Sequence, residues 1–249
     1  MIYLDNAAST AVHPEVVKEM LPYFDVQYGT PSSIHQFGRK AKNAIQKARK
    51  QVAALIGAEQ DEILFTSGGT ESNNTILYGF PTLRDVSHVS FSFDKNHIIT
   101  SSIEHEAILE PCKKLEEKGV KITYLPVDEH GIIDSNDVTN SIAENTVLVS
   151  IMFANNEVGT IQPIKEISEI CKKYQIPLHT DAVQAVGKVP INVKELGVDA
   201  LSISSHKING PKGIGALFIK KGLKIVPYIT GGGQENGLRS GTENVASIV

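Results

Sequence analysis

Residues 62–79, EILFTSGGTESNNTILYG, contain the pattern that decides the fold: a short apolar run, a glycine turn and a helical segment. The same order of apolar run and helical pattern recurs downstream, in HIITSS with HEAILEPCKKLEEKG, in TVLVSIM with PIKEISEICKKY, and then in PLHTDA. Strands that alternate with helices are typical of an open α/β sheet with helices on both faces. We therefore expect a three-layer α/β sandwich around a mainly parallel, mixed sheet.

The regions on either side extend this interpretation. Segment Ser33–Ile56 predicts a long amphipathic helix that ends at Gly57, because apolar or small residues follow three-and-four spacing at Ala41, Ala44, Ile45, Ala48, Val52 and Leu55. Downstream, the runs DALSISS, IGALFIK and KIVPYI predict strands at the edge of the sheet, with mixed directions. Weak boundaries are expected at the polar stretch Pro81–Asn96 and at the glycine run Gly231–Gly233.

Composition limits the class of protein. The chain has 249 residues, of which 41% are hydrophobic and 21% charged, as in ordinary globular proteins of one large domain or one and a part. A net charge of −4 with dispersed basic residues argues against nucleic acid or an anionic membrane as a partner. The first ten residues lack a signal-peptide pattern, and the 2 cysteines are too few for a disulfide framework or a metal site. We expect a cytoplasmic location.

The glycine turn is a candidate phosphate cradle. Ser67-Gly68-Gly69-Thr70 follows a strand and opens a helix, so free backbone N–H groups and the positive end of the helix dipole can hold an anion. The Thr70 hydroxyl would add a donor. Taken alone, the stretch is a weak signal and is more typical of an ordinary glycine-lined turn in which Thr70 caps the helix.

Two charged residues also follow predicted strands. Asp181 comes after the strand Ile176–Thr180, where a buried carboxylate needs a cationic or hydrogen-bonding partner, although it could instead cap a following helix, DAVQAVG. Lys207 comes after DALSISS and before a Gly-Pro loop, where it is either a solvated lysine or one that reacts with an aldehyde. A phosphate cradle, an acid and a lysine are together what pyridoxal 5'-phosphate (PLP) requires.

Eight ordered motifs strengthen this interpretation. They are YLDNAAST, GTPSSIHQFGR, FTSGGTESNN, SSIEHEAIL, FANNEVGTIQPI, HTDAVQAVGK, SSHKINGPKGIGALF and GGGQENGLRSGTENV. In them the whole chain resembles the cysteine desulfurase branch of the class V aminotransferase family, which has PLP fold type I. The resemblance implies that residues 14–249 form the PLP-binding large domain. Residues 1–13 would belong to a small domain whose remainder is absent from this chain.

The resemblance also implies roles for individual residues. Lys207 would bind the cofactor aldehyde, Asp181 the pyridine nitrogen and Gln184 the ring hydroxyl. Asn155 would contact the bound substrate. His105 would stack on the ring and move protons to the leaving sulfur, although a histidine at a helix start can also be a simple cap.

The phosphate end is implied in the same way. Thr70, Ser204 and His206 would bind the phosphate, with Gly69 in the cradle. Thr242 would reach the phosphate of a second subunit, which implies a homodimer with the site at its interface.

The implied activity converts L-cysteine to L-alanine and passes the sulfur to an enzyme cysteine, and then to an acceptor such as an iron–sulfur scaffold protein. Cys112 and Cys171 have helical core spacing, so we expect both to be buried and neither to be the reactive thiol. The family's persulfide cysteine and its carboxylate-binding arginine would lie beyond residue 249. Because the sequence stops in what resembles the start of a helix, we expect a fragment that binds PLP without completing sulfur transfer.

Two alternatives remain at this stage. Another class V enzyme, such as a selenocysteine lyase or an aminotransferase, would share the same cofactor residues. An inactive PLP-binding fragment would share them as well.

Overall fold

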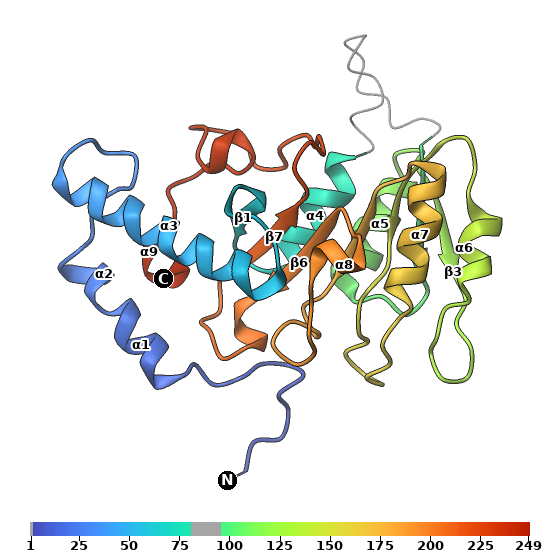
Figure 1. Ribbon diagram of the computed structural model, residues 1–249, viewed down its shortest axis with the longest axis horizontal. Helices are drawn as coiled ribbons and strands as arrows, with labels where there is room; N and C mark the ends of the chain where they lie inside the picture. Colours follow the sequence, from blue (N-terminus) through green and yellow to red (C-terminus); the bar gives the residue numbers. More distant parts are fainter. Residues whose placement is uncertain (1, 81–95) are drawn as a thin grey trace.

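The computed structural model describes residues 2–80 and 96–249 and has a mixed sheet at its centre (Figure 1). Within these residues the strands are β1 (Ile63–Thr66), β2 (His97–Ser101), β3 (Lys121–Leu125), β4 (Thr146–Ser150), β5 (Leu178–Asp181), β6 (Ala200–Ser204) and β7 (Gly215–Ile219). Their order in space is β1-β7-β6-β5-β4-β2-β3, and β7 is antiparallel to both of its neighbours. The other pairs are parallel, which confirms the α/β class and the mixed sheet.

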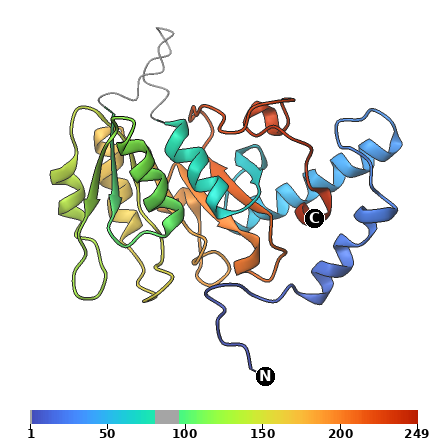
Figure 2. The ribbon, with the colours of Figure 1, turned by 180° about the vertical axis from the view of Figure 1, so that it is seen from behind.

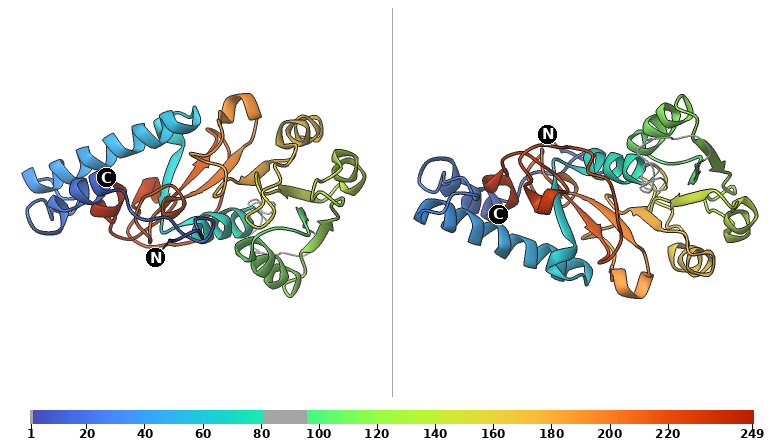
Figure 3. Two further views of the ribbon diagram at one scale, coloured as in Figure 1. Left: turned by 90° about the horizontal axis from the view of Figure 1, so that it is seen from below. Right: turned by 90° about the horizontal axis from the view of Figure 1, so that it is seen from above.

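Helices cover both faces of the sheet. In the described residues they are α1 (Pro14–Met20), α2 (Pro22–Asp25), α3 (Gln36–Ile56), α4 (Gly69–Gly79), α5 (Glu106–Glu116), α6 (Ser135–Ser141), α7 (Ile164–Tyr174), α8 (Val193–Leu196) and α9 (Val245–Ile248). Short 3-10 turns lie at η1 (Gln60–Glu62), η3 (Ser205–Lys207) and η4 (Glu235–Gly237). Helices α3 and α7 pack on one face, while α4 and α5 cover the other, as Figure 2 shows from behind and Figure 3 shows along the layers.

Alternation along the strands builds the two cores. Successive residues of a strand point to opposite faces, so Ile99 and Val149 join the core under α3 and α7, while Ile98 and Leu148 join the core under α4 and α5. Runs that are apolar on both faces are typical of such covered sheets. No helix of the described residues is long and apolar enough to cross a membrane.

The long helix α3 differs slightly from its prediction. It begins at Gln36 with His35 as N-cap, and it ends at Gly57, whose φ of 71° lies in the left-handed region that favours glycine. Leu55 was expected in the core face but is 48% exposed, while Ala53 and Ile56 are buried instead. The buried face of α3 therefore includes positions 53 and 56 and leaves position 55 on the exposed side.

Three other predictions of elements were wrong. KIVPYI forms no strand, since Pro227 lies within it and Ile229 makes only a single bridge, to Arg239. Strands β6 and β7, from DALSISS and IGALFIK, both lie inside the sheet instead of at its edge. DAVQAVG forms consecutive turns instead of a helix, because Gly187 takes a φ of 76° and Pro190 follows.

Other elements were not anticipated, or lie where the structure gives no test. Strand β3 was missed because only one of its residues is buried, and α6 was missed as well. The boundary expected at Pro81–Asn96 lies, apart from Asn96, outside the described residues. Because six strands share one direction, their carboxyl ends meet at one edge of the sheet, where polar groups gather.

Candidate functional site

A cavity of about 460 Å³ opens at the carboxyl ends of the strands. This volume lies in the range of small-molecule sites, roughly 300–1,000 Å³. Eight of the residues singled out from the sequence line it: Gly69, Thr70, His105, Asp181, Gln184, Ser204, His206 and Lys207. They come from four separate stretches of the chain, so the fold brings together residues that are far apart in the sequence.

The start of α4 forms one wall of the cavity. Gly68 is the N-cap, with a φ of 151° that favours glycine, and it provides no side-chain cap. The backbone N–H groups of the first helical residues, Gly69 and Thr70, therefore have no partner within the helix and lie at its positive end. The alternative in which Thr70 caps this helix was wrong, because Gly68 takes that position.

Glycine is also needed at position 69. A Cβ placed there would lie 2.8 Å from Cγ2 of Val183, which is closer than side chains pack. The same Cβ would lie 3.7 Å from Cβ of Ser204, at the end of β6, and both Ser204 and His206 line the cavity. The donors and the close backbone approach suit an anion such as a phosphate group.

Asp181 ends β5 and is buried at 7% exposure. One carboxylate oxygen accepts a hydrogen bond from Asn73 Nδ2 at 2.7 Å, and the other accepts one from the Val183 N–H at 2.9 Å. Burial raises the pKa of Asp181 in spite of these donors and of the nearby His105 and Lys207. A cation on the cavity side would offset that burial and hold the carboxylate ionised.

Lys207 reaches the cavity from the 3-10 turn η3. Its Nζ donates to the carbonyl oxygens of Ala7 and Ala8, the latter at 3.0 Å. Burial, helped by the charge of Lys188, lowers the pKa of Lys207, while Asp181 acts in the opposite direction. A lowered pKa leaves more of the amine neutral, as attack on an aldehyde requires.

The N-terminal segment closes this side of the site. Gln184 Nε2 donates to Ala7 O at 2.8 Å, and Thr10 N donates to His206 O at 2.8 Å. Asp5, Ala7 and Ala8 line the cavity. Residues far apart in the sequence are thus bound together around the lysine.

His105 has two roles in the geometry. It is the N-cap of α5, where its Nδ1 accepts a hydrogen bond from the Ala107 N–H at 3.0 Å, and it also lines the cavity. His105 therefore both caps α5, as the alternative stated, and lines the cavity. Since Nδ1 is the acceptor, a neutral ring carries its proton on Nε2, which leaves Nε2 as the nitrogen for proton exchange.

Two predicted residues do not line the cavity. The Asn155 side chain donates to Ile103 O at 2.9 Å and accepts from the Glu157 N–H at 2.9 Å, although its neighbour Asn156 does line the cavity. Thr242 lies at a separate cavity of about 190 Å³. Its expected contact is with a second subunit, so that assignment stays a prediction.

Asn73, which lines the cavity, and the buried Glu104 next to His105 were not singled out from the sequence. Asn73 follows Thr70 by three residues on α4 and holds Asp181, so helical spacing from the glycine turn was the signal for it. Glu104 Oε1 accepts hydrogen bonds from Ser101 Oγ at 2.7 Å and from the Met152 N–H at 2.8 Å. Burial raises the pKa of Glu104 to about 8.

The two cysteines are buried as predicted. Cys112 is 0% and Cys171 1% exposed. Burial raises the pKa of each thiol to about 12, so both stay protonated at neutral pH. Neither can serve as an accessible thiolate.

Comparison with known proteins identifies the family. Residues 2–249 match the family described as "Aminotransferase class-V". The chain belongs to the class V aminotransferase family. Members of this family are PLP-dependent enzymes, and the cavity's donors suit that cofactor, with an anion cradle, a buried acid and an amine of lowered pKa in one space.

Individual class V relatives are similar over the whole chain. Cysteine desulfurase IscS of Dictyoglomus turgidum is 55% identical over 248 residues, which are 100% of this chain and 61% of that relative. A solved NifS-like protein is 46% identical with a TM-score of 0.92, over 99% of this chain and 66% of the other. The solved structure of SspA in complex with cysteine is 42% identical with a TM-score of 0.94, over 100% of this chain and 70% of the other. The chain thus spans about three fifths of the length of the curated relative.

Proposed function

We propose that this chain is the PLP-binding part of a cysteine desulfurase. The observation that carries the proposal is that Asp181 and Lys207, 26 positions apart in the sequence, face one cavity beside a glycine-capped helix start. The similarity to IscS relatives supports the choice of reaction within the family.

The cavity residues divide into groups by the part of the cofactor they would hold. Gly69, Thr70, Ser204 and His206 would bind the phosphate, and Gln184 the ring hydroxyl. Asp181 would pair with the pyridine nitrogen, and Lys207 would bind the aldehyde carbon. Asn155, Thr242 and the division at residue 14 remain parts of the proposal that rest on the resemblance.

Three residues of this chain, Asp181, Lys207 and His105, would then hold or transfer protons. The bound cofactor supplies an electron sink for the substrate carbanion. Asp181 keeps the ring nitrogen protonated, Lys207 Nζ takes the proton from the substrate Cα, and His105 Nε2 can exchange a proton at the leaving sulfur. The buried Asn73 holds Asp181 in place by its hydrogen bond.

Substrate, partners and location complete the proposal. L-cysteine would be converted to L-alanine, and the solved structure of SspA in complex with cysteine supports that substrate class. The persulfide thiol would be supplied by neither Cys112 nor Cys171, since both are buried. We also propose a cytoplasmic homodimer that passes sulfur to an acceptor protein for iron–sulfur cluster assembly or thiolation.

Covalent capture of the cofactor tests the proposal. The protein is incubated with PLP, reduced with borohydride, digested and mapped by mass spectrometry. We expect a reduced cofactor adduct on Lys207 and complete loss of that adduct in Lys207→Ala, because Lys207 is the one lysine of the described residues that lines the cavity. Lys188→Ala is the matched control: Lys188 lies close enough to influence Lys207 by its charge but does not line the cavity, so its adduct should be unchanged. An undiminished adduct in Lys207→Ala would refute the assignment.

A further inference from the structure

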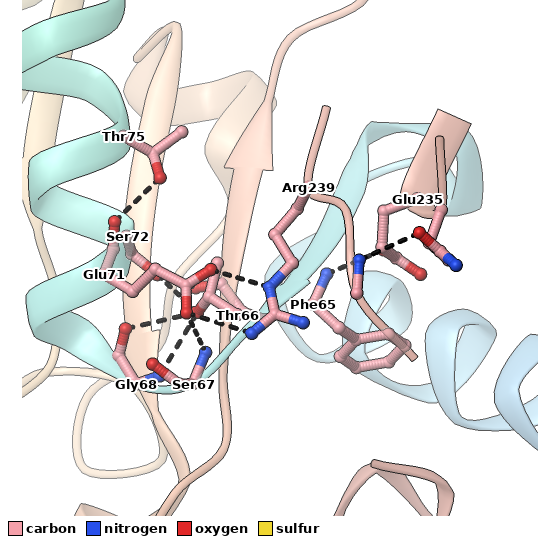
Figure 4. Close-up of polar contacts among 12 residues, drawn as sticks. Phe65, Thr66, Ser67, Gly68, Glu71, Ser72, Thr75, Glu235 and Arg239 are labelled. Atoms are coloured by element: carbon pink, nitrogen blue, oxygen red, sulfur yellow. Dashed lines mark hydrogen bonds and ion pairs between the residues drawn. The ribbon is translucent and has the colours of Figure 1, made fainter. Parts of the chain in front are cut away.

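Two ion pairs attach residues 229–244, here called the docked loop, to the body of the protein. Figure 4 shows Glu235 and Arg239 of this loop beside β1 and the start of α4. Arg49 of α3 donates to Glu235, with Nη1 to Oε2 at 2.9 Å. Arg239 donates to Glu71, with Nε to Oε1 at 2.9 Å and Nη2 to Oε2 at 3.3 Å.

The second pair reaches the candidate phosphate cradle directly. Glu71 is the third residue of α4, and its Oε2 also accepts the Ser67 N–H at 2.8 Å, across the glycine turn. The carboxylate therefore closes the turn that contains Gly68, Gly69 and Thr70. The side chain of Glu71 is 7% exposed and that of Arg239 is 23% exposed, so the pair is largely shielded from water.

Charge explains why the two residues belong together. Burial acts to raise the pKa of Glu71, but hydrogen bonds from Arg239 and Ser67 outweigh it and leave the pKa lowered, so the carboxylate stays ionised. An uncompensated carboxylate beside the cradle would repel a phosphate dianion. Arg239 cancels that charge and, through its forked contact, holds the carboxylate against Ser67.

We propose that Glu71 and Arg239 are positioning residues for the phosphate end of the cofactor. Glu71 fixes the backbone of the cradle, and Arg239 keeps Glu71 in place and neutralises it. The inference rests on the proposed function, and it assigns to the docked loop a part in shaping a site whose cavity it does not line.

The first ion pair provides a matched control. Arg49 and Glu235 form a guanidinium–carboxylate pair that anchors the same loop and is more deeply buried than the Glu71–Arg239 pair. Their further contacts are to Ile63 O and the Phe65 N–H on β1, and not to the cradle. Loss of either pair should loosen the loop, which contains the proposed phosphate ligand Thr242, but only loss of the Glu71–Arg239 pair should also disturb the cradle itself.

Binding of PLP and of pyridoxal, which lacks the phosphate, separates these effects. Dissociation constants for both are measured by cofactor absorbance on the full chain as wild type, Arg239→Gln, Arg239→Lys and Arg49→Gln. We expect Arg239→Gln to lower the preference for PLP over pyridoxal about tenfold, the size of one hydrogen bond to a charged group. Arg239→Lys keeps the charge but loses the fork, so about threefold is expected. Arg49→Gln should lower thermal stability and lower the preference by much less than Arg239→Gln does, because it loosens the loop without touching the cradle.

Each contrary outcome has a definite meaning. An unchanged preference in Arg239→Gln, or in Arg239→Lys if the glutamine variant does not fold, would overturn the inference. Equal losses in Arg239→Gln and Arg49→Gln would overturn it too, because loop stability would then account for both. A wild-type chain that binds no PLP would overturn the proposed function itself, whereas normal wild-type binding with unaffected variants would overturn the inference alone.

Discussion

The middle of the sheet and its carboxyl edge both bury polar side chains, but they use them differently. In the middle, both ring nitrogens of His179 are bonded, to Ser150 Oγ at 2.8 Å and Ser202 Oγ at 2.9 Å on the neighbouring strands. His97 bridges Thr146 and Thr123 in the same way, at 2.8 Å each. At the edge, Asn73 Oδ1, Glu104 Oε2 and Thr180 Oγ1 are buried without a hydrogen-bond partner in the described part of the chain.

The difference separates residues that hold the fold from a region with unused hydrogen-bonding capacity, in which Asn73 lines the cavity. Each histidine links three strands and uses its full hydrogen-bonding capacity within the protein, as buried polar groups normally do. The edge keeps unused capacity and perturbed charges, which cost stability and are typical of functional sites. The following predictions test whether the two regions differ in this way.

Loss of a bridging histidine should have the largest effect on stability. His179→Ala leaves a cavity and removes the partner of both Ser150 and Ser202, so we expect the free energy of unfolding at pH 7.5 to fall by about 4 kcal/mol. Urea denaturation measures it, and Ser202→Ala, which removes one of the two bonds, should show a smaller loss. His130→Ala, at a 73% exposed side chain, is the control. A loss under 1 kcal/mol in His179→Ala would contradict the structural role.

The sequence alone was sufficient to predict the site residues that directly follow the ends of strands. The cradle Gly69 and Thr70, the acid Asp181 and the lysine Lys207 all lie where an apolar run stops, and local pattern reveals such positions. The α/β class followed from the alternation of apolar runs with helical patterns. The buried faces of α5 and α7, which contain the two cysteines, followed from helical spacing.

Contacts between distant segments could not be found in this way. Asn73 and Asp181 are 108 positions apart, and Arg239 and Glu71 are 168 apart. Nothing in local spacing says which strands will be neighbours, so the histidine bridges and the inner place of β7 were both invisible. Element type depends on local pattern, whereas sheet order depends on pairing across the chain.

The edge should respond to pH in the direction opposite to the middle. Burial raises the pKa of Glu104 from its ordinary value of 4.5 to about 8, so the folded protein holds this proton more tightly than the unfolded chain does. Its contribution to stability is therefore lost as pH rises from about 4.5 to 8. Glu104→Gln cannot ionise, so its stability relative to wild type should improve by about 3 kcal/mol between pH 5 and pH 7.5. Urea denaturation at both values measures this, with the exposed Glu106→Gln as control; a constant difference would show that Glu104 is not a buried neutral acid.

The bridging histidine gives the converse and smaller effect. Burial lowers the pKa of His179 from 6.5 to about 3. Between pH 3 and pH 6.5 the unfolded chain therefore binds a proton at this residue, whereas the folded protein does not. Stability from this residue is complete above pH 6.5 and falls with pH below it, by about 2 kcal/mol at pH 5. His179→Ala has no such proton, so its deficit against wild type should narrow by about that amount from pH 7.5 to pH 5. The same denaturation series measures it. A deficit that widens in acid would mean that the ring is charged in the folded protein, and the two serines would then be only acceptors of its protons.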